Sequence, residues 1–173
     1  MIQVDLSKCT GCRSCETACS FYRTGKVSRH LSRIKVMHIY ETGIDGPVSC
    51  IQCDEKYCMP CPESALKIGT LGQVIASPTI CTRCEACVTK CPIGAIELFN
   101  DIIYVCDLCG GRPKCVEACT EGAILYRPNQ PSVTSLKDIK ARTKSMNPNE
   151  KRREYIEFLG EEIRKNWREG RDR

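Results

Sequence analysis

The sequence has little of what usually builds a hydrophobic core. Aromatic residues make up 6% of its 173 residues, and there is a single Trp. No apolar run approaches the roughly 18 residues that a helix needs to span a bilayer. The stretch from Met1 to Leu6 lacks the charged and apolar segments of a secretory signal peptide, and no twin-arginine signal is present. We therefore expect a cytoplasmic protein without a membrane span, whose thin core needs another source of stability.

Groups that usually carry out catalysis are also scarce. The sequence has two His residues, His30 and His38, and we expect both to be surface or sheet residues and not ligands. No Ser/His/Asp arrangement stands out, and Gly110 and Gly111 belong to a loop that does not match a phosphate-binding motif. Nothing in these residues indicates a catalytic site.

Cysteine, in contrast, is abundant, with 16 residues. Such a count can indicate a secreted disulfide scaffold. Thiols stay reduced in the cytoplasm, however, and clustered cysteines there usually bind metal or take part in catalysis. Metal coordination would also supply the missing stability, because ligand binding couples to folding. We therefore interpret the cysteines as metal ligands.

The cysteines fall into four runs. Run 3, which ends at Cys91-Pro92, has the spacing C-x2-C-x2-C-x3-C-P, typical of ferredoxin segments that hold [4Fe–4S] cubanes. Run 1 repeats the 2-2-3 spacing, whereas the middle gap is four residues in run 2 and five in run 4. In sequence order the runs are Cys9, Cys12, Cys15 and Cys19; Cys50, Cys53, Cys58 and Cys61; Cys81, Cys84, Cys87 and Cys91; and Cys106, Cys109, Cys115 and Cys119.

Zinc is the alternative metal for any single pair of cysteines, since a tetrahedral set of four sulfurs suits either zinc or an iron–sulfur cluster. Structural zinc sites typically combine two separate C-x2-C pairs. They do not need a third cysteine two residues further on and a fourth three residues beyond it. The spacing therefore predicts four [4Fe–4S] clusters, which the 16 cysteines would ligate with none left over.

The fourth cysteine of each run is expected to ligate a different cluster from the first three, as in two-cluster ferredoxins. Runs 2 and 3 are neighbours, and the 20 positions from Cys61 to Cys81 suit a hairpin and its return. We therefore pair run 2 with run 3 and run 1 with run 4, although pairing run 1 with run 2 and run 3 with run 4 stays open. The preferred ligand sets are Cys9, Cys12, Cys15 and Cys119; Cys19, Cys106, Cys109 and Cys115; Cys50, Cys53, Cys58 and Cys91; and Cys61, Cys81, Cys84 and Cys87.

A short internal repeat follows the last cysteine of runs 2, 3 and 4. Each copy places a small Ala beside a predicted cluster and then leads an aliphatic residue into a strand. The copies are Cys61-Pro-Glu-Ser-Ala-Leu66, Cys91-Pro-Ile-Gly-Ala-Ile96 and Cys119-Thr-Glu-Gly-Ala-Ile124. Returning strands would close small hairpins. We expect strands at residues 2–6 and 34–40, a turn at 42–47, and a turn with a returning strand at 72–75 and at 100–104.

The last part of the sequence has a different composition. Residues 127–147 are polar and contain Pro128 and Pro131, so we expect an extended arm. Asn147 and Glu150 then have the spacing of a capping box, which predicts a helix from there on. Apolar residues at positions 155, 156, 159, 163 and 167 form a stripe on this helix. A lone helix is marginally stable in water, so the stripe should dock either on the body of the protein or on a partner.

The net charge gives weak evidence on partners. The formal net charge is +5, and basic residues accumulate after Tyr126. Four clusters with their thiolates would add enough negative charge to make the metal-loaded protein slightly acidic. A cysteine-rich module that binds nucleic acid is thus the less favoured alternative, and about four zinc ions without acid-labile sulfide would indicate it.

The four runs, together with the endings Cys61-Pro62 and Cys91-Pro92, resemble the four-cluster, polyferredoxin-like electron-transfer subunits of multi-subunit oxidoreductases. The resemblance covers roughly residues 1–126 and implies an α+β fold of two bacterial-ferredoxin-like halves related by a pseudo-twofold axis. It also implies the preferred ligand sets. The inner half would comprise about residues 50–105, from runs 2 and 3, and the outer half runs 1 and 4. Residues 127–173 would form the docking arm and helix.

Relatives in this family serve tungsten and molybdenum pterin enzymes, hydrogenases, formate dehydrogenases and carbon monoxide dehydrogenase. The segment Cys9–Phe21 looks most like small subunits of tungsten aldehyde oxidoreductases and benzoyl-CoA reductases. The resemblance thus implies a non-catalytic subunit that carries single electrons between a pterin enzyme and a further redox subunit or carrier. Alternatives are an electron-transfer subunit of a hydrogenase, formate dehydrogenase or carbon monoxide dehydrogenase, and a free soluble polyferredoxin. Within the main interpretation, the protein could also self-associate into longer wires.

Overall fold

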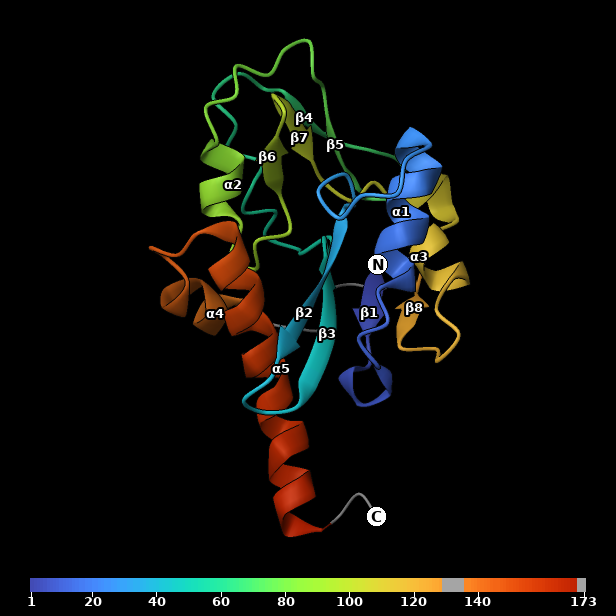
Figure 1. Cartoon of the computed structure of the whole chain (residues 1–173). Helices are drawn as coiled ribbons and strands as arrows, with labels where there is room; N and C mark the ends of the chain where they lie inside the picture. The colour runs from blue at the N-terminus through green and yellow to red at the C-terminus, as the bar shows by residue number, and fades with distance from the viewer. Residues whose placement is uncertain (129–135, 171–173) are drawn as a thin grey trace.

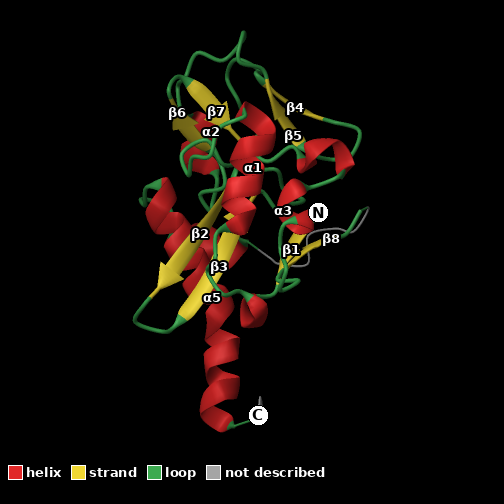
Figure 2. Cartoon of the chain, turned by 45° about the vertical axis from the view of Figure 1, so that its right-hand side comes forward, coloured by secondary structure: helices red, strands yellow, loops and turns green. Residues whose placement is uncertain are grey.

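The computed structural model describes residues 1–128 and 136–170, so part of the expected arm lies outside the described residues. Within this part of the protein, small antiparallel two-stranded sheets alternate with short helices (Figures 1 and 2). The sheets pair β1 (Ile2–Val4) with β8 (Ile124–Tyr126), β2 (Ile34–Ile39) with β3 (Ile44–Ser49), β4 (Leu66–Ile68) with β5 (Val74–Ala76), and β6 (Glu97–Phe99) with β7 (Ile102–Tyr104). The helices are η1 (Leu6–Lys8), α1 (Ser14–Thr24), α2 (Ala86–Lys90), η2 (Leu108–Gly111), α3 (Lys114–Glu117), α4 (Lys137–Arg142) and α5 (Pro148–Glu169).

Strands β1 and β8 bring the beginning of the chain against its second half. Ile2 pairs with Tyr126 and Val4 with Ile124, and the N-terminal ammonium of Met1 donates to the carbonyl oxygen of Arg127 at 2.5 Å. Helix α1 lies along α3 on the same side of the molecule (Figure 1). This pairing places run 1 next to run 4, although about 90 residues separate them in the sequence.

Each copy of the internal repeat leads into a strand, as the sequence predicts. Strands β4, β6 and β8 begin at Leu66, Glu97 and Ile124, directly at or after the aliphatic residue of each copy. The predicted returning strands are β5 and β7, which close two hairpins, and the β6–β7 hairpin lies near α2 (Figure 1). The prediction of hairpins after runs 2 and 3 is therefore confirmed, whereas the third copy pairs with the first strand of the protein.

The hairpin β2–β3 occupies the centre of the molecule. Its first strand was predicted from the alternation of residues 34–40, but the predicted turn at 42–47 is wrong at its end, because β3 already begins at Ile44. Gly43 adopts a φ of +66°, which a glycine accommodates without a side-chain clash, so the chain turns earlier than expected. Pro47 pairs with Val36 within the strand, which is possible because a two-stranded sheet has only edge strands.

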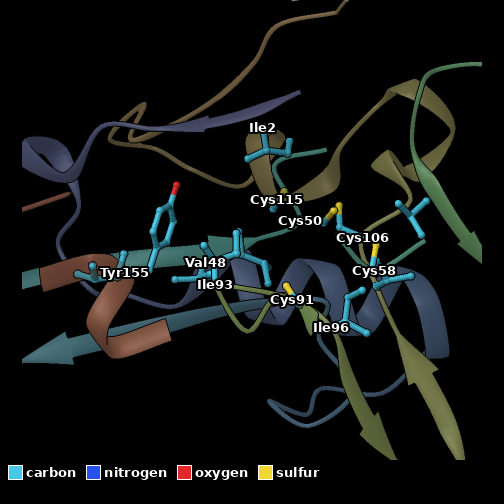
Figure 3. Packing of buried hydrophobic residues seen from close by; sticks show 14 of the residues in the cluster. Ile2, Val48, Cys50, Cys58, Cys91, Ile93, Ile96, Cys106, Cys115 and Tyr155 are labelled. Carbon is cyan, nitrogen blue, oxygen red and sulfur yellow. The ribbon is translucent and has the colours of Figure 1, made fainter. Parts of the chain in front are cut away.

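Helix α5 packs its first half against β2 and β3. It begins as predicted: the Asn147 side chain accepts from the backbone N–H groups of Asn149 and Glu150, and the Glu150 carboxylate accepts from the N–H of Asn147. Ile156 is fully buried, and Tyr155 joins the core near the hairpin (Figure 3). The apolar stripe of the helix therefore docks on the body of its own chain.

The second half of α5 extends beyond the sheet (Figure 1). Gly160 is buried, and a Cβ added there would lie 2.6 Å from Cδ1 of Ile44, so the missing side chain permits the helix to approach β3 closely. Trp167, the last apolar residue of the stripe, is 49% exposed. The stripe is thus only partly used within the protein.

Helix α4 departs from the sequence prediction of an extended arm at residues 127–147. Ile139 is completely buried on this helix, and Leu136 just before it is almost so. The Oγ1 of Thr143 donates to the carbonyl oxygen of Pro92 at 2.9 Å and ties the end of α4 to the segment after run 3. Long-range packing of a few apolar residues therefore produces a helix where the local composition favours an extended segment.

None of the described helices is long and apolar enough to cross a membrane.

Candidate metal centres

The structure brings the first three cysteines of run 1 together with the last cysteine of run 4. Cys9, Cys12, Cys15 and Cys119 line one hollow. We call this set site A. The hollow lies between the loop after η1 and the residues that lead into β8, so the β1–β8 pairing creates it.

A second hollow has the corresponding composition from runs 2 and 3. Its lining includes Cys61, Cys81, Cys84 and Cys87. We call this set site D. Ala65 of the repeat and Ile103 of β7 also contribute to the wall. In both hollows, three cysteines come from one run and one from the partner run.

The other eight cysteines correspond to the two remaining ligand sets predicted from the sequence. Site B denotes Cys19, Cys106, Cys109 and Cys115, and site C denotes Cys50, Cys53, Cys58 and Cys91. The thiol of Cys115 lies within electrostatic reach of Cys106, Cys19 and Cys109. The thiol of Cys58 has Cys91 and Cys53 as such neighbours. Figure 3 shows five of these cysteines among the buried aliphatic side chains.

Burial perturbs these thiols strongly. Desolvation raises the pKa of Cys15 and of Cys58 to about 12, with smaller contributions from neighbouring negative groups. Desolvation likewise raises the pKa of Cys87 and of Cys106 to about 11. Without metal these thiols therefore keep their protons at neutral pH. A bound cation must displace these protons, and the negative thiolates then have a positive partner.

Backbone N–H groups point at the sulfur atoms in a pattern that follows the internal repeat. The N–H of Ala95 donates to Sγ of Cys91, and the N–H of Ala123 donates to Sγ of Cys119, each at 3.3 Å. In both copies the donor is the Ala four residues after the cysteine. Such donors favour the thiolate form and tune the potential of a bound cluster.

Run 1 breaks the repeat and finds its donor elsewhere. Cys19 lies within α1, and its Sγ accepts from the backbone N–H of Arg33 at 3.3 Å. The Arg33 guanidinium also pairs with Asp107 at 2.7 Å, and Arg23 of α1 pairs with the same carboxylate. Asp107 in turn accepts from the N–H of Cys109, so these ion pairs hold the loop of run 4 against α1.

Besides Arg33, two residues that organise the sites were not predicted from the sequence. Gln52 donates from Nε2 to the carbonyl oxygen of Cys106 at 3.0 Å and accepts from the N–H of Val74 at 3.1 Å. Lys151 of α5 donates from Nζ to the carbonyl oxygen of Cys91 at 3.1 Å. Cys106 lies 54 positions from Gln52, and Cys91 lies 60 positions from Lys151. No local pattern of residues indicates contacts over such separations.

The two histidines lie outside the cysteine sets. His38 belongs to β2, as expected, where its Nδ1 contacts Asp45 at 2.6 Å and its Nε2 accepts from Arg13 at 2.9 Å. His30 stacks on the ring of Phe99. Both therefore have structural partners among the described residues.

The donor sets fit iron–sulfur clusters. Each of the two hollows is lined by four cysteines together with apolar residues such as Ile124 and Ile103. Four sulfur ligands, N–H donors to sulfur and an apolar wall are the elements that hold and tune a [4Fe–4S] cubane.

Comparison with known proteins supports this assignment. Residues 1–24 and 74–97 each match a family described as "4Fe-4S binding domain". These stretches contain runs 1 and 3, the two runs with 2-2-3 spacing. The fold and the donor sets thus define a ferredoxin-like protein that binds several [4Fe–4S] clusters.

Curated relatives give the family. The polyferredoxin-like subunit of aliphatic sulfonate oxidoreductase from Pyrococcus furiosus is 40% identical over 124 residues, which cover 69% of this protein and 71% of the relative. An uncharacterized ferredoxin from Methanocaldococcus jannaschii is 30% identical over 96% of this protein and 97% of its own length. One subunit of the anaerobic dimethyl sulfoxide reductase from Escherichia coli is 29% identical over 72% and 71%, respectively. The protein belongs to the family of polyferredoxin-like electron-transfer subunits of oxidoreductases, and it is a non-catalytic member.

Proposed function

We propose that this subunit carries single electrons through four [4Fe–4S] clusters, at sites A, B, C and D, between a tungsten or molybdenum pterin subunit and a further redox partner. The observation that supports it most is the succession of the sites. The thiol of Cys115 in site B is within electrostatic reach of Cys15 in site A. The thiol of Cys50 in site C is within such reach of Cys106 in site B, and that of Cys58 in site C of Cys87 in site D. These relationships support a path in the order A, B, C, D.

In this proposal residues 1–126 form one four-cluster domain with two related halves. Sites A and B would belong to the outer half, from runs 1 and 4, and sites C and D to the inner half, from runs 2 and 3. The inner half spans about residues 50–105. The hydrogen bond from Gln52 to Cys106 crosses between the halves and supports one continuous path. Residues 127–173 would form the docking arm and helix.

The protein residues set the distances between the clusters and tune their reduction potentials. A bound cluster supplies the one-electron redox chemistry. Buried aliphatic side chains such as Ile96 and Val48 exclude water from sites B and C, and N–H donors such as that of Ala95 stabilise negative charge on sulfur (Figure 3). No described residue needs to exchange a proton or bind a substrate for electron transfer.

The relatives support a partner enzyme. The Pyrococcus furiosus relative is named as a subunit of a sulfonate oxidoreductase, and the Escherichia coli relative as part of a dimethyl sulfoxide reductase. Together with the family resemblance, these names favour a pterin enzyme as the catalytic partner. The abundance of free thiols favours the cytoplasm.

Anaerobic purification of the native complex tests the proposal. We expect roughly sixteen iron and sixteen acid-labile sulfide per protein molecule, as four cubanes require. Tungsten or molybdenum should co-purify with a larger subunit. A well-folded protein without iron and sulfide, or with about four zinc ions, would contradict the proposal. A cluster-loaded protein that elutes alone would indicate a free polyferredoxin instead.

A further inference from the structure

Helices α2, α4 and the beginning of α5 lie on the same side of the molecule (Figure 1). Residues from all three line a cleft that is rich in lysine. Its volume is about 750 Å³, which is within the range of binding pockets. One acidic residue, Glu55, lines it. The basic residues around it are Lys90, Lys137, Lys140, Lys144 and Lys151.

Part of the cleft wall is formed by residues next in sequence to the cysteines of site C. Tyr57, which precedes the ligand Cys58, and Pro92, which follows Cys91, both line the cleft. Lys151 is 2% exposed, and its Nζ donates to the carbonyl oxygens of Thr89 and Cys91 at 2.6 and 3.1 Å. Lys151 thus links the cleft to the backbone of a site C cysteine.

Several of the basic groups are held in place by the protein. Lys90 donates from Nζ to the carbonyl oxygen of Pro60 at 3.1 Å, and Nζ of Lys140 lies 4.4 Å from the ring centroid of Tyr57. The ring and the ammonium group form a cation–π contact. The positive charge is thus distributed over the walls at the ends of different elements and is not focused on one point.

We propose that this cleft docks an acidic electron-carrier protein and serves as a side port, through which electrons join or leave the path at site C, between its ends at sites A and D. The inference rests on the proposed function. We infer an acidic partner from charge complementarity. An excess of lysines attracts an acidic protein surface to the cleft and increases the rate of association of the two proteins. The lysines come from α2, α4 and α5, and charge spread over several elements suits the broad acidic surface of a protein.

The test compares two charge reversals of equal size in the full, cluster-loaded protein. The cleft variant is Lys137→Glu, Lys140→Glu and Lys144→Glu, all on or beside α4. The control variant is Lys67→Glu, Lys165→Glu and Arg168→Glu, which lie on exposed parts of β4 and α5. A third variant carries Gln at the three cleft positions, which removes the positive charges without introducing negative ones. Iron content and circular dichroism show whether each variant is folded and loaded with clusters.

The readout is the second-order rate of reduction by a reduced ferredoxin of net negative charge, measured anaerobically by stopped flow. We expect the cleft reversal to slow this reaction by at least about tenfold at low salt and to remove most of its salt dependence. The rate of the Gln variant should lie between the rates of the wild type and the cleft reversal. The control reversal should stay within about twofold of the wild type, as should all variants with methyl viologen as the donor.

Two outcomes would overturn the proposal. One is an equal ferredoxin rate in the cleft and control variants. The other is an unchanged ferredoxin rate together with saturable binding of pyrophosphate that only the cleft reversal abolishes, which would assign a small-anion site. If methyl viologen fails to reduce the wild-type protein, the proposed electron-transfer function fails instead, so the two failures are distinguishable.

Discussion

The side-chain amide of Gln52 donates to the carbonyl oxygen of Cys106 at 3.0 Å. Gln52 follows the first cysteine of run 2 closely, and Cys106 begins run 4, so this hydrogen bond joins the two pairs of runs. Gln52 is 8% exposed, and its Oε1 also accepts from the N–H of Val74. One buried side chain thus satisfies two backbone groups from different parts of the protein.

Replacement of Gln52 should weaken this junction. Gln52→Leu keeps the approximate volume but leaves the carbonyl of Cys106 and the N–H of Val74 unpaired. Each unsatisfied buried group costs about 1–3 kcal/mol. We expect the midpoint of thermal cluster bleaching to fall by roughly 5 °C or more. Gln3→Leu, which alters a half-buried Gln on β1, is the control and should change the midpoint by less than about 2 °C. Equal midpoints for the two variants would contradict the bridging role.

Two glycines of the internal repeat provide a matched pair for testing how α5 docks. Gly94 and Gly122 both have a φ of +63°. A Cβ at Gly94 would collide with the carbonyl oxygen of Pro148, at the beginning of α5, whereas a Cβ at Gly122 meets nothing within 4 Å.

We therefore expect Gly94→Ala to destabilise the protein more than Gly122→Ala. Both substitutions cost about 1 kcal/mol for the left-handed backbone, but only the first must also displace α5. Limited proteolysis near residue 147 and thermal bleaching measure the difference. If both variants behave alike, contact between the repeat of run 3 and the helix is unimportant for stability.

The capping box of α5 should contribute measurably to its docking. Asn147→Ala removes the acceptor for the N–H groups of Asn149 and Glu150, and should lower the stability by about 1 kcal/mol. Asn149→Ala, two positions later in the first turn, keeps the cap and is the control. Amide hydrogen exchange in the first turns of α5 should become faster in the first variant and stay unchanged in the second.

The crossing of ligands between runs can be tested by non-additivity. If Cys91 and Cys58 share site C, Cys58→Ser and Cys91→Ser should each cost about one cluster, and the double variant should cost no more than one. The pair Cys87→Ser and Cys91→Ser, both from run 3, should cost two clusters. Iron, sulfide and the electron paramagnetic resonance of the reduced protein measure the losses. The opposite pattern would place all four cysteines of run 3 on one cluster.

Ionisation of the buried Tyr155 should lower the free energy of unfolding in alkaline solution. Burial raises the pKa of Tyr155 to about 12 in the folded protein, against about 10 for an exposed tyrosine. The folded state therefore binds the proton more tightly. This contribution is fully present below pH 10 and is lost as the pH rises through 12, by roughly 2–3 kcal/mol.

A phenylalanine at this position cannot ionise. We expect Tyr155→Phe to unfold more slowly than the wild type at pH 11 but at a similar rate at pH 8. Tyr40, which is 84% exposed, gives the control: Tyr40→Phe should follow the wild type at both pH values. The rate of cluster bleaching after a pH jump measures this, and parallel behaviour of both variants would exclude Tyr155 as the origin.

The sequence predicted the parts of the molecule that depend on neighbouring residues. The spacing of run 3 up to Cys91 indicates the cluster type, and the alternation that begins at Ile34 indicates a strand. The pair Asn147 and Glu150 predicts the first turn of a helix, and the structure has it there. These predictions succeed because turn chemistry, strand alternation and helix capping act over a few residues. The same locality explains the error at residues 42–47, where Gly43 closes the turn earlier than the composition suggests.

Only the tertiary structure decided which distant segments meet. Sequence left open whether run 1 lies beside run 2 or run 4, and the β1–β8 pairing places it beside run 4. Helix α4, the burial of Lys151 against the carbonyl of Cys91 and the lysine cleft also arise from contacts between segments far apart in the sequence. Such contacts depend on the summed packing of many weak interactions, to which no short pattern of residues corresponds.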